Sequence, residues 1–137
     1  MELVISAVFG DPQKPADHIA ETVREVRKKL KEEFGVLEME GLEKIDMFLC
    51  FSGSLSTYYP SSGIYQSRYH RKEKKLTLTV HFSEGEWSGR EEEDRKIFCQ
   101  GYRTYLLRLS GLIRKKVGQG FDEEAYRQAV KRSFESF

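Results

Sequence analysis

Residues 88–117 read SGREEEDRKIFCQGYRTYLLRLSGLIRKKV, and this stretch decides the fold. Ser88 stands three residues before Glu91, the spacing of a capping box, in which two side chains satisfy backbone N–H groups at a helix start. Apolar residues then recur at alternating steps of four and three, the period of one helix face. The members of this stripe are Phe98, Tyr102, Tyr105, Leu109 and Leu112, widened by Cys99, Leu106 and Ile113. We therefore predict a long helix against which the rest of the chain packs.

The chain before this helix predicts a strand, a helix and a second strand. Residues 3–9 are a compact apolar run that ends at a Gly-Asp-Pro turn signal, as expected of a buried strand. A helix should follow, from the Pro15 and Asp17 region to Gly35, because apolar residues return along one face. Residues 45–51 are almost uninterruptedly apolar, which predicts a central strand.

Residues 64–70 and 75–82 flank four charged residues and predict a hairpin, with residues 64–70 as the edge strand. Near the end of the chain, Asp122 is the expected N-cap of a last helix, and Phe121 and Tyr126 are placed to form a hydrophobic staple. The predicted order is β-α-β-β-β-α-α. We expect one α+β domain over residues 1–137, with a mostly antiparallel sheet of about four strands packed by an N-terminal, a long and a C-terminal helix.

The composition fits a single globular domain. The chain has 137 residues, 39% of them hydrophobic and 33% charged, and its formal net charge is +1. This charge excludes a strongly basic nucleic-acid binder. The first nine residues lack the basic start of a signal peptide, and no run of about 18 apolar residues occurs, so we expect a cytoplasmic protein. Cys50 and Cys99 lie in apolar segments and should be reduced, although the sequence leaves their separation open.

The sequence predicts no catalytic set, no metal site and no cofactor. His18, His70 and His81 are scattered, without the close spacing of zinc ligands. The acidic run 91–94 lies in the first turn of the long helix, where carboxylates offset the positive end of the helix dipole. The serines of residues 52–62 lack the setting of a hydrolase nucleophile.

Aromatic residues in and around the loop-like segment 52–63 are the candidates for recognition. Tyr and Trp beside Ser and Gly suit binding surfaces, because they offer a large rigid contact area with a polar tip. We predict a partner-binding role for Tyr58, Tyr59, Tyr65, Tyr69 and Trp87. The competing interpretation is that several of these rings cap the core.

A small α+β build without a catalytic set, with a Tyr/Ser-rich loop beside a hairpin, resembles the small bacterial immunity proteins of polymorphic or contact-dependent toxin systems. The resemblance implies a non-enzymatic, cytoplasmic protein-binding module that binds and blocks a cognate toxin domain. It identifies no toxin class, because the net charge of +1 gives no clear polarity.

Two alternatives remain open from the sequence. The first is a small-molecule-binding or enzymatic domain, with a pocket between the sheet and the long helix that is lined by His81 or by Tyr102 and Tyr105. The second is a nucleic-acid-associated factor that uses the basic residues of the hairpin. These are Arg68, His70, Arg71, Lys72, Lys74 and Lys75. The near-neutral charge of the chain disfavours this second alternative.

Overall fold

The structure is a computed structural model, and it describes residues 1–9, 17–51, 65–82 and 90–137. The elements in chain order are β1 (Glu2–Phe9), α1 (Asp17–Gly35), β2 (Lys44–Phe51), β3 (Tyr65–His70), β4 (Lys75–Phe82), α2 (Glu91–Val117), the short 3-10 helix η3 (Gly118–Gly120) and α3 (Glu123–Ser133). The α+β class and the predicted element order are confirmed.

The four strands lie in the order β1-β2-β4-β3. The predicted mostly antiparallel sheet is wrong, because β1 pairs with β2 and β2 with β4 in parallel, and only β3 and β4 are antiparallel. The reason lies in the connections. Helix α1 carries the chain back between β1 and β2, so both strands run the same way. Strand β3 runs oppositely and lies outside β4, so β4 again runs parallel to β2.

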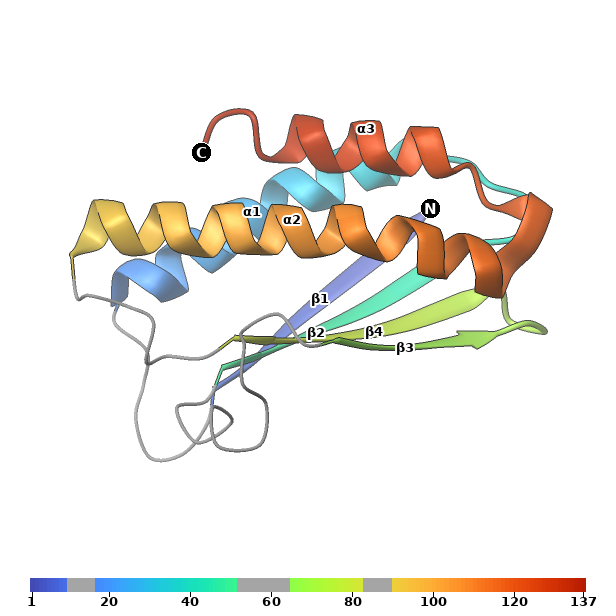
Figure 1. The fold of residues 1–137 in the computed structure, drawn as a ribbon, viewed down its shortest axis with the longest axis horizontal. Coiled ribbons are helices and arrows are strands. Elements are labelled where there is room, and N and C mark those ends of the chain that lie inside the picture. Colours follow the sequence, from blue (N-terminus) through green and yellow to red (C-terminus); the bar gives the residue numbers. More distant parts are fainter. Residues whose placement is uncertain (10–16, 52–64, 83–89) are drawn as a thin grey trace.

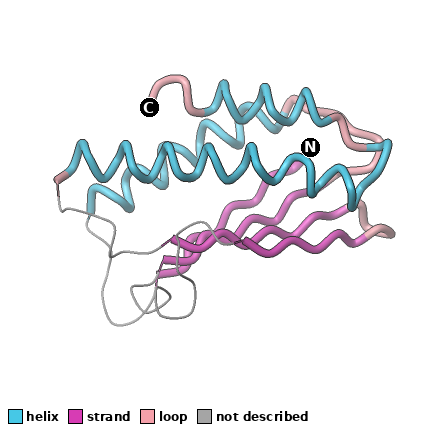
Figure 2. The backbone as a smooth tube through the Cα atoms, in the orientation of Figure 1, coloured by secondary structure: helices cyan, strands magenta, loops and turns pink. Residues whose placement is uncertain are grey.

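All three α-helices lie on the same side of this sheet, and α3 packs against α1 and α2 (Figures 1 and 2). The core between the sheet and the helices takes the alternate residues of each strand. In β2, Met47 and Leu49 are each 1% exposed, whereas Phe48 between them is 38% exposed and points away from the helices. The central position of β2 is confirmed, as are the hairpin and the edge position of β3.

Helix α2 buries most of the predicted stripe, including Phe98, Tyr102 and Leu109, while Tyr105 and Leu112 lie partly buried beside it. The helix begins at Glu91 and its N-cap residue is Arg90, whose side chain makes no capping hydrogen bond. The N-cap position predicted for Ser88 is therefore wrong. Ser88 itself lies outside the described residues.

The start of α3 follows its prediction closely. The Asp122 side chain accepts a hydrogen bond from the backbone N–H of Ala125 at 3.0 Å. The rings of Phe121 and Tyr126 lie 5.4 Å apart, centroid to centroid, and close the hydrophobic staple. Since Tyr126 is fully buried, this contact fixes the angle at which α3 leaves η3.

Two glycines far apart in the sequence bring two backbones into contact. The Gly41 N–H donates to the Gly120 carbonyl oxygen at 2.9 Å. A Cβ on Gly120 would lie 2.6 Å from the Gly41 Cα and N atoms, and a Cβ on Gly41 would lie 2.8 Å from a Val117 methyl carbon. Only glycine fits at this crossing, which holds the α1–β2 connection against η3.

Candidate functional site

Of the five residues predicted to bind a partner, Tyr58, Tyr59 and Trp87 lie outside the described residues. Tyr65 begins β3, where its backbone pairs with Val80. Tyr69 is described in full. It is partly buried against the core, and its hydroxyl donates to the Gly41 carbonyl oxygen at 2.6 Å.

This hydrogen bond gives Tyr69 a role within the fold. It ties the edge strand β3 to the glycine crossing between the α1–β2 connection and η3. The ring therefore has both a polar partner and an apolar contact inside the protein. The competing interpretation, in which a ring caps the core, applies to Tyr69, and partner binding by the five residues stays a prediction.

The alternative from the sequence is a pocket between the sheet and α2, but around Tyr102 this region is packed core. This side chain is 1% exposed, and its hydroxyl donates to the sulfur of Met47 on β2. Its ring contacts Phe82 and Phe134 edge to face, at centroid distances of 5.8 and 5.6 Å. The ring is thus packed on both the sheet and the end of α3, and Tyr102 lines none of the hollows described below.

The basic hairpin is partly neutralised by its own neighbours. Lys75 lies 3.3 Å from a Glu73 oxygen and 4.0 Å from an Asp46 oxygen. Lys74 lies 4.0 Å from an oxygen of Glu43. These pairs are exposed or half-buried and therefore weak, but they lower the positive field that a phosphate backbone would meet.

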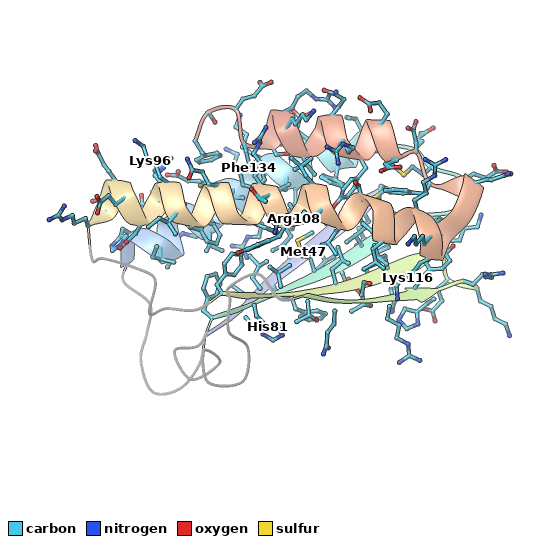
Figure 3. The ribbon with its side chains drawn as sticks, in the orientation of Figure 1. Met47, His81, Lys96, Arg108, Lys116 and Phe134 are labelled. Carbon is cyan, nitrogen blue, oxygen red and sulfur yellow. The ribbon has the colours of Figure 1, made fainter. Side chains whose placement is uncertain are left out.

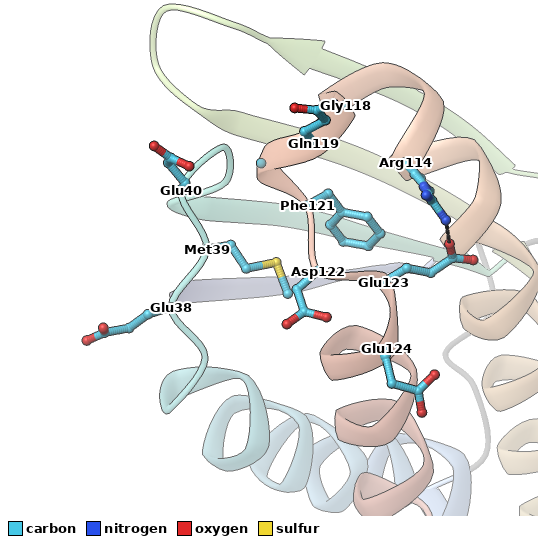
Figure 4. A pocket seen from close by; sticks show the side chains of 11 residues that line it. Glu38, Met39, Glu40, Arg114, Gly118, Gln119, Phe121, Asp122, Glu123 and Glu124 are labelled. Atoms are coloured by element: carbon cyan, nitrogen blue, oxygen red, sulfur yellow. Dashed lines mark hydrogen bonds and ion pairs between the residues drawn. The ribbon is translucent and has the colours of Figure 1, made fainter.

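A hollow of about 710 Å³ lies beside η3, and we call it the acidic groove (Figure 4). One wall comes from the segment after α1, with Glu38, Met39 and Glu40, and the other from the turn between α2 and α3. The second wall carries Asp122, Glu123 and Glu124, and Arg114 of α2. Five carboxylates against one guanidinium make the groove a place where a cationic group would be attracted.

Three of these five carboxylates already serve helix α3. Asp122 is its N-cap, Glu123 lies 3.1 Å from the Arg114 guanidinium, and Glu124 accepts from the Gln128 amide at 2.9 Å. Carboxylates in a first turn also stabilise the helix through its dipole. The negative charge of the groove is therefore largely explained by the start of α3. Glu38 and Glu40 remain exposed, with no ion pair to the described residues.

A partly buried His–Asp pair is a polar feature that the sequence did not indicate. His18 Nε2 lies 2.9 Å from Asp94 Oδ2, and Asp94 is 1% exposed, so the pair joins the start of α1 to the first turn of α2. The run 91–94 lies in the first turn of α2 as predicted, and its last residue, Asp94, has in addition a buried ion-pair role that the sequence did not indicate. Asp94 lies four residues before Phe98 and eight before Tyr102, and this spacing places it on the buried stripe.

Within the described ranges, no three His, Cys, Asp or Glu side chains gather as ligands for a metal ion. Cys50 and Cys99 are both free in the structure, and their reduced state stays a prediction. Cys50 stands between two residues that face the helices, so its side chain points away from α2. Burial raises the pKa of both thiols, that of Cys99 to about 11. None of the helices in the described part of the chain is long and apolar enough to cross a membrane.

Comparison with known proteins adds the family. Neither the curated proteins nor the solved structures include a significant match to this chain. The family model of Immunity protein 12, called Imm12, matches residues 1–130, which run from the first residue of the described fold into α3. The match agrees with the resemblance expected from the α+β build and the absence of a recognisable catalytic motif. Since it covers nearly the whole chain, the protein belongs to the Immunity protein 12 family.

Proposed function

We propose that this protein binds and neutralises a cognate bacterial toxin in the cytoplasm, without catalytic activity of its own. The observation that carries the proposal is the family match over residues 1–130, which includes every strand and all but the end of α3. A protein of this class acts by occupying its partner, so its surface rather than an internal pocket should carry the function. The filled core around Tyr102 supports this.

For the contact surface we propose Tyr58, Tyr59, Tyr65, Tyr69 and Trp87. Tyr and Trp supply much of the binding energy of protein interfaces for little loss of side-chain entropy. Tyr69 would contribute the exposed part of its ring, since its hydroxyl is engaged by Gly41.

The direct test is co-expression with the cognate toxin domain, to be sought among the reading frames that neighbour the gene. We expect the protein to restore growth of cells that express the toxin, and to form a complex of fixed stoichiometry with a catalytically inactive form of it. Growth arrest that persists despite soluble, folded protein, together with no complex by calorimetry, would refute the proposal.

A second experiment separates the aromatic contacts from the function itself. We expect Tyr58→Ala with Tyr59→Ala to weaken toxin binding while the melting temperature stays nearly unchanged. A large loss of stability would instead assign these rings to the core. Unchanged affinity with unchanged stability would remove them from the interface.

A further inference from the structure

A second hollow, of about 510 Å³, lies between the first half of α2 and the chain that ends α3, and we call it the cationic cleft. Helix α2 lines it with Lys96, Cys99 and Arg103, whose spacings of three and four residues place them on one helix face. Lys131, Phe134 and Phe137 line the opposite side. In Figure 3, Lys96 projects from α2 and Phe134 lies between α2 and α3.

The floor of the cleft is apolar and held by the core. Cys99 and Phe134 are 4% and 5% exposed. The Phe134 ring packs edge to face on Tyr102, at a centroid distance of 5.6 Å. The centroid of the Phe137 ring lies 6.5 Å from that of Phe134. The Arg95 guanidinium carbon lies 5.1 Å from the Phe137 ring centroid. The floor is therefore preformed, so a ligand would gain apolar contact without ordering it.

The rim carries three cations that the described residues leave without an ion pair: Lys96, Arg103 and Lys131. Two neighbouring arginines, by contrast, are paired. Arg95 lies 2.7 Å from a Glu25 oxygen, and Arg132 lies 2.8 Å from a Glu33 oxygen.

One carboxylate, the exposed Glu135, lines the cleft among the described residues, so three positive charges face one negative charge there. The acidic groove differs, because most of its carboxylates are engaged by α3. The cationic cleft thus keeps its charge available for a partner.

We infer that the cationic cleft receives an acidic segment of the cognate toxin. An apolar side chain of that segment lies over Phe134, and its carboxylates pair with Lys96, Arg103 and Lys131. Charge-assisted hydrogen bonds between carboxylates and Arg or Lys are stronger than neutral ones, and Arg can accept a carboxylate in two bonds. The inference rests on the proposed function, since it names the part of the toxin that the protein holds.

The same three cations would also attract phosphate groups. Three cations around an apolar floor suit a short peptide better than a nucleic acid, whose affinity comes from many phosphate contacts along a basic surface. The net charge of +1 for the whole chain agrees with this choice. The occupant we assign is therefore a protein segment.

The test compares two triple variants with the same change in charge. The first is Lys96→Glu, Arg103→Glu and Lys131→Glu, at the cleft. The second, as the control, is Arg24→Glu, Lys31→Glu and Lys115→Glu, all exposed and outside it. Lys115 and Lys131 each stand in the last turn of a helix, so both triples lose one favourable dipole contact.

The measurement is calorimetry with the inactive toxin domain. We expect the cleft variant to bind on the order of 100-fold more weakly than the wild type, and the control to stay within about threefold. The wild-type affinity should fall with added salt, and that of the cleft variant should fall less. Equal affinity of the cleft variant and the wild type would overturn the inference while leaving the proposed function intact. Failure of the wild type to bind would refute the proposed function first.

A milder variant guards against misfolding, because Lys96→Glu adds a carboxylate four residues after Glu92. In Lys96→Gln, Arg103→Gln and Lys131→Gln the charges are removed without reversal. We expect this variant to keep the wild-type melting temperature and to bind the toxin about tenfold more weakly. A single-stranded DNA oligonucleotide is the further probe. If it binds the wild type and not the cleft variants, the occupant is a nucleic acid and the inference is wrong.

Discussion

At the scale of single residues, Tyr69 shows why the sequence could not separate partner binding, which stays a prediction, from a role within the fold. Its position beside a segment rich in Ser and Tyr favours binding of a protein partner. In the structure its hydroxyl donates to the Gly41 carbonyl oxygen inside the protein. We expect Tyr69→Phe to lower the free energy of unfolding by about 1 kcal/mol, since one net hydrogen bond is lost. Urea unfolding would measure it. Toxin affinity should stay unchanged, because the ring remains; unchanged stability with lost affinity would place the hydroxyl in the interface.

Cys99 offers a pH-dependent test. Burial raises its pKa from 9.0 to about 11, so the folded protein keeps this thiol protonated where the unfolded chain ionises it. Unfolding then releases a proton, and the stability present below pH 9.0 is lost as the pH rises toward about 11. We expect this loss to be smaller in Cys99→Ala. Chemical denaturation of both proteins across this window measures the difference, and parallel curves would count against a perturbed thiol.

At the scale of elements, the crossing of the α1–β2 connection with η3 depends on two glycines. Gly120→Ala would place a Cβ 2.6 Å from the Gly41 backbone, so we expect a loss of about 1–3 kcal/mol in unfolding free energy. The matched control is Gly111→Ala in α2, where nothing lies within 4 Å. There we expect a gain of about 0.5–1 kcal/mol, because alanine restricts the unfolded chain and favours helix. Thermal unfolding of both variants measures the two changes in stability. Equal changes would contradict the close contact between Gly41 and Gly120.

Strand β2 presents its two faces to different surroundings. Leu49 is 1% exposed and faces the helices, whereas Phe48 is 38% exposed and faces away. We expect Leu49→Thr to cost more than about 3 kcal/mol, through lost apolar contact and a buried hydroxyl. Phe48→Thr should lower the free energy of unfolding by about 1 kcal/mol, because threonine has a high propensity for β-strands. Comparable losses at the two positions would show that the face away from the helices is also covered.

The elements that the sequence predicted correctly are those with a local signal. The stripe of α2, the cap at Asp122 and the alternation of β4 each follow from residues three, four or two apart. The parallel pairing of β2 with β4 has no such signal, because it depends on which strands meet across the chain. The pairing of Asp94 with His18 was missed for a related reason, since the two residues lie 76 positions apart.

The candidate binding surfaces likewise divide into features with a local sequence signal and features that depend on distant residues. Residue type pointed to Tyr69, but the Gly41 carbonyl that holds its hydroxyl could not be predicted, since 28 residues separate them. The cationic cleft was missed altogether. Lys96 and Lys131 stand on different helices, and only the return of α3 along α2 brings them to one hollow.

At the scale of the whole molecule, the formal charge of +1 hides a separation of charge. The cationic cleft reaches Arg103 on α2 and the acidic groove begins at Arg114, which is about 16 Å further along the helix axis at 1.5 Å per residue. A partner with the opposite arrangement would be oriented before contact. Composition alone cannot detect this, because it adds charges without placing them.

The parallel order of the sheet also bears on how the protein reaches its native state. Strand β2 meets β1 and β4 through residues such as Ile45, whose partners are Leu3 and Leu76. Both pairings close long stretches of chain, so the contact order of the sheet is high and its central strand cannot form alone. The β3–β4 hairpin and isolated turns of α2 can form earlier, but β4 then lacks the strand that joins it to β1. Folding should therefore be limited by the docking of β2, and until then the chain exposes the apolar edge that most invites aggregation.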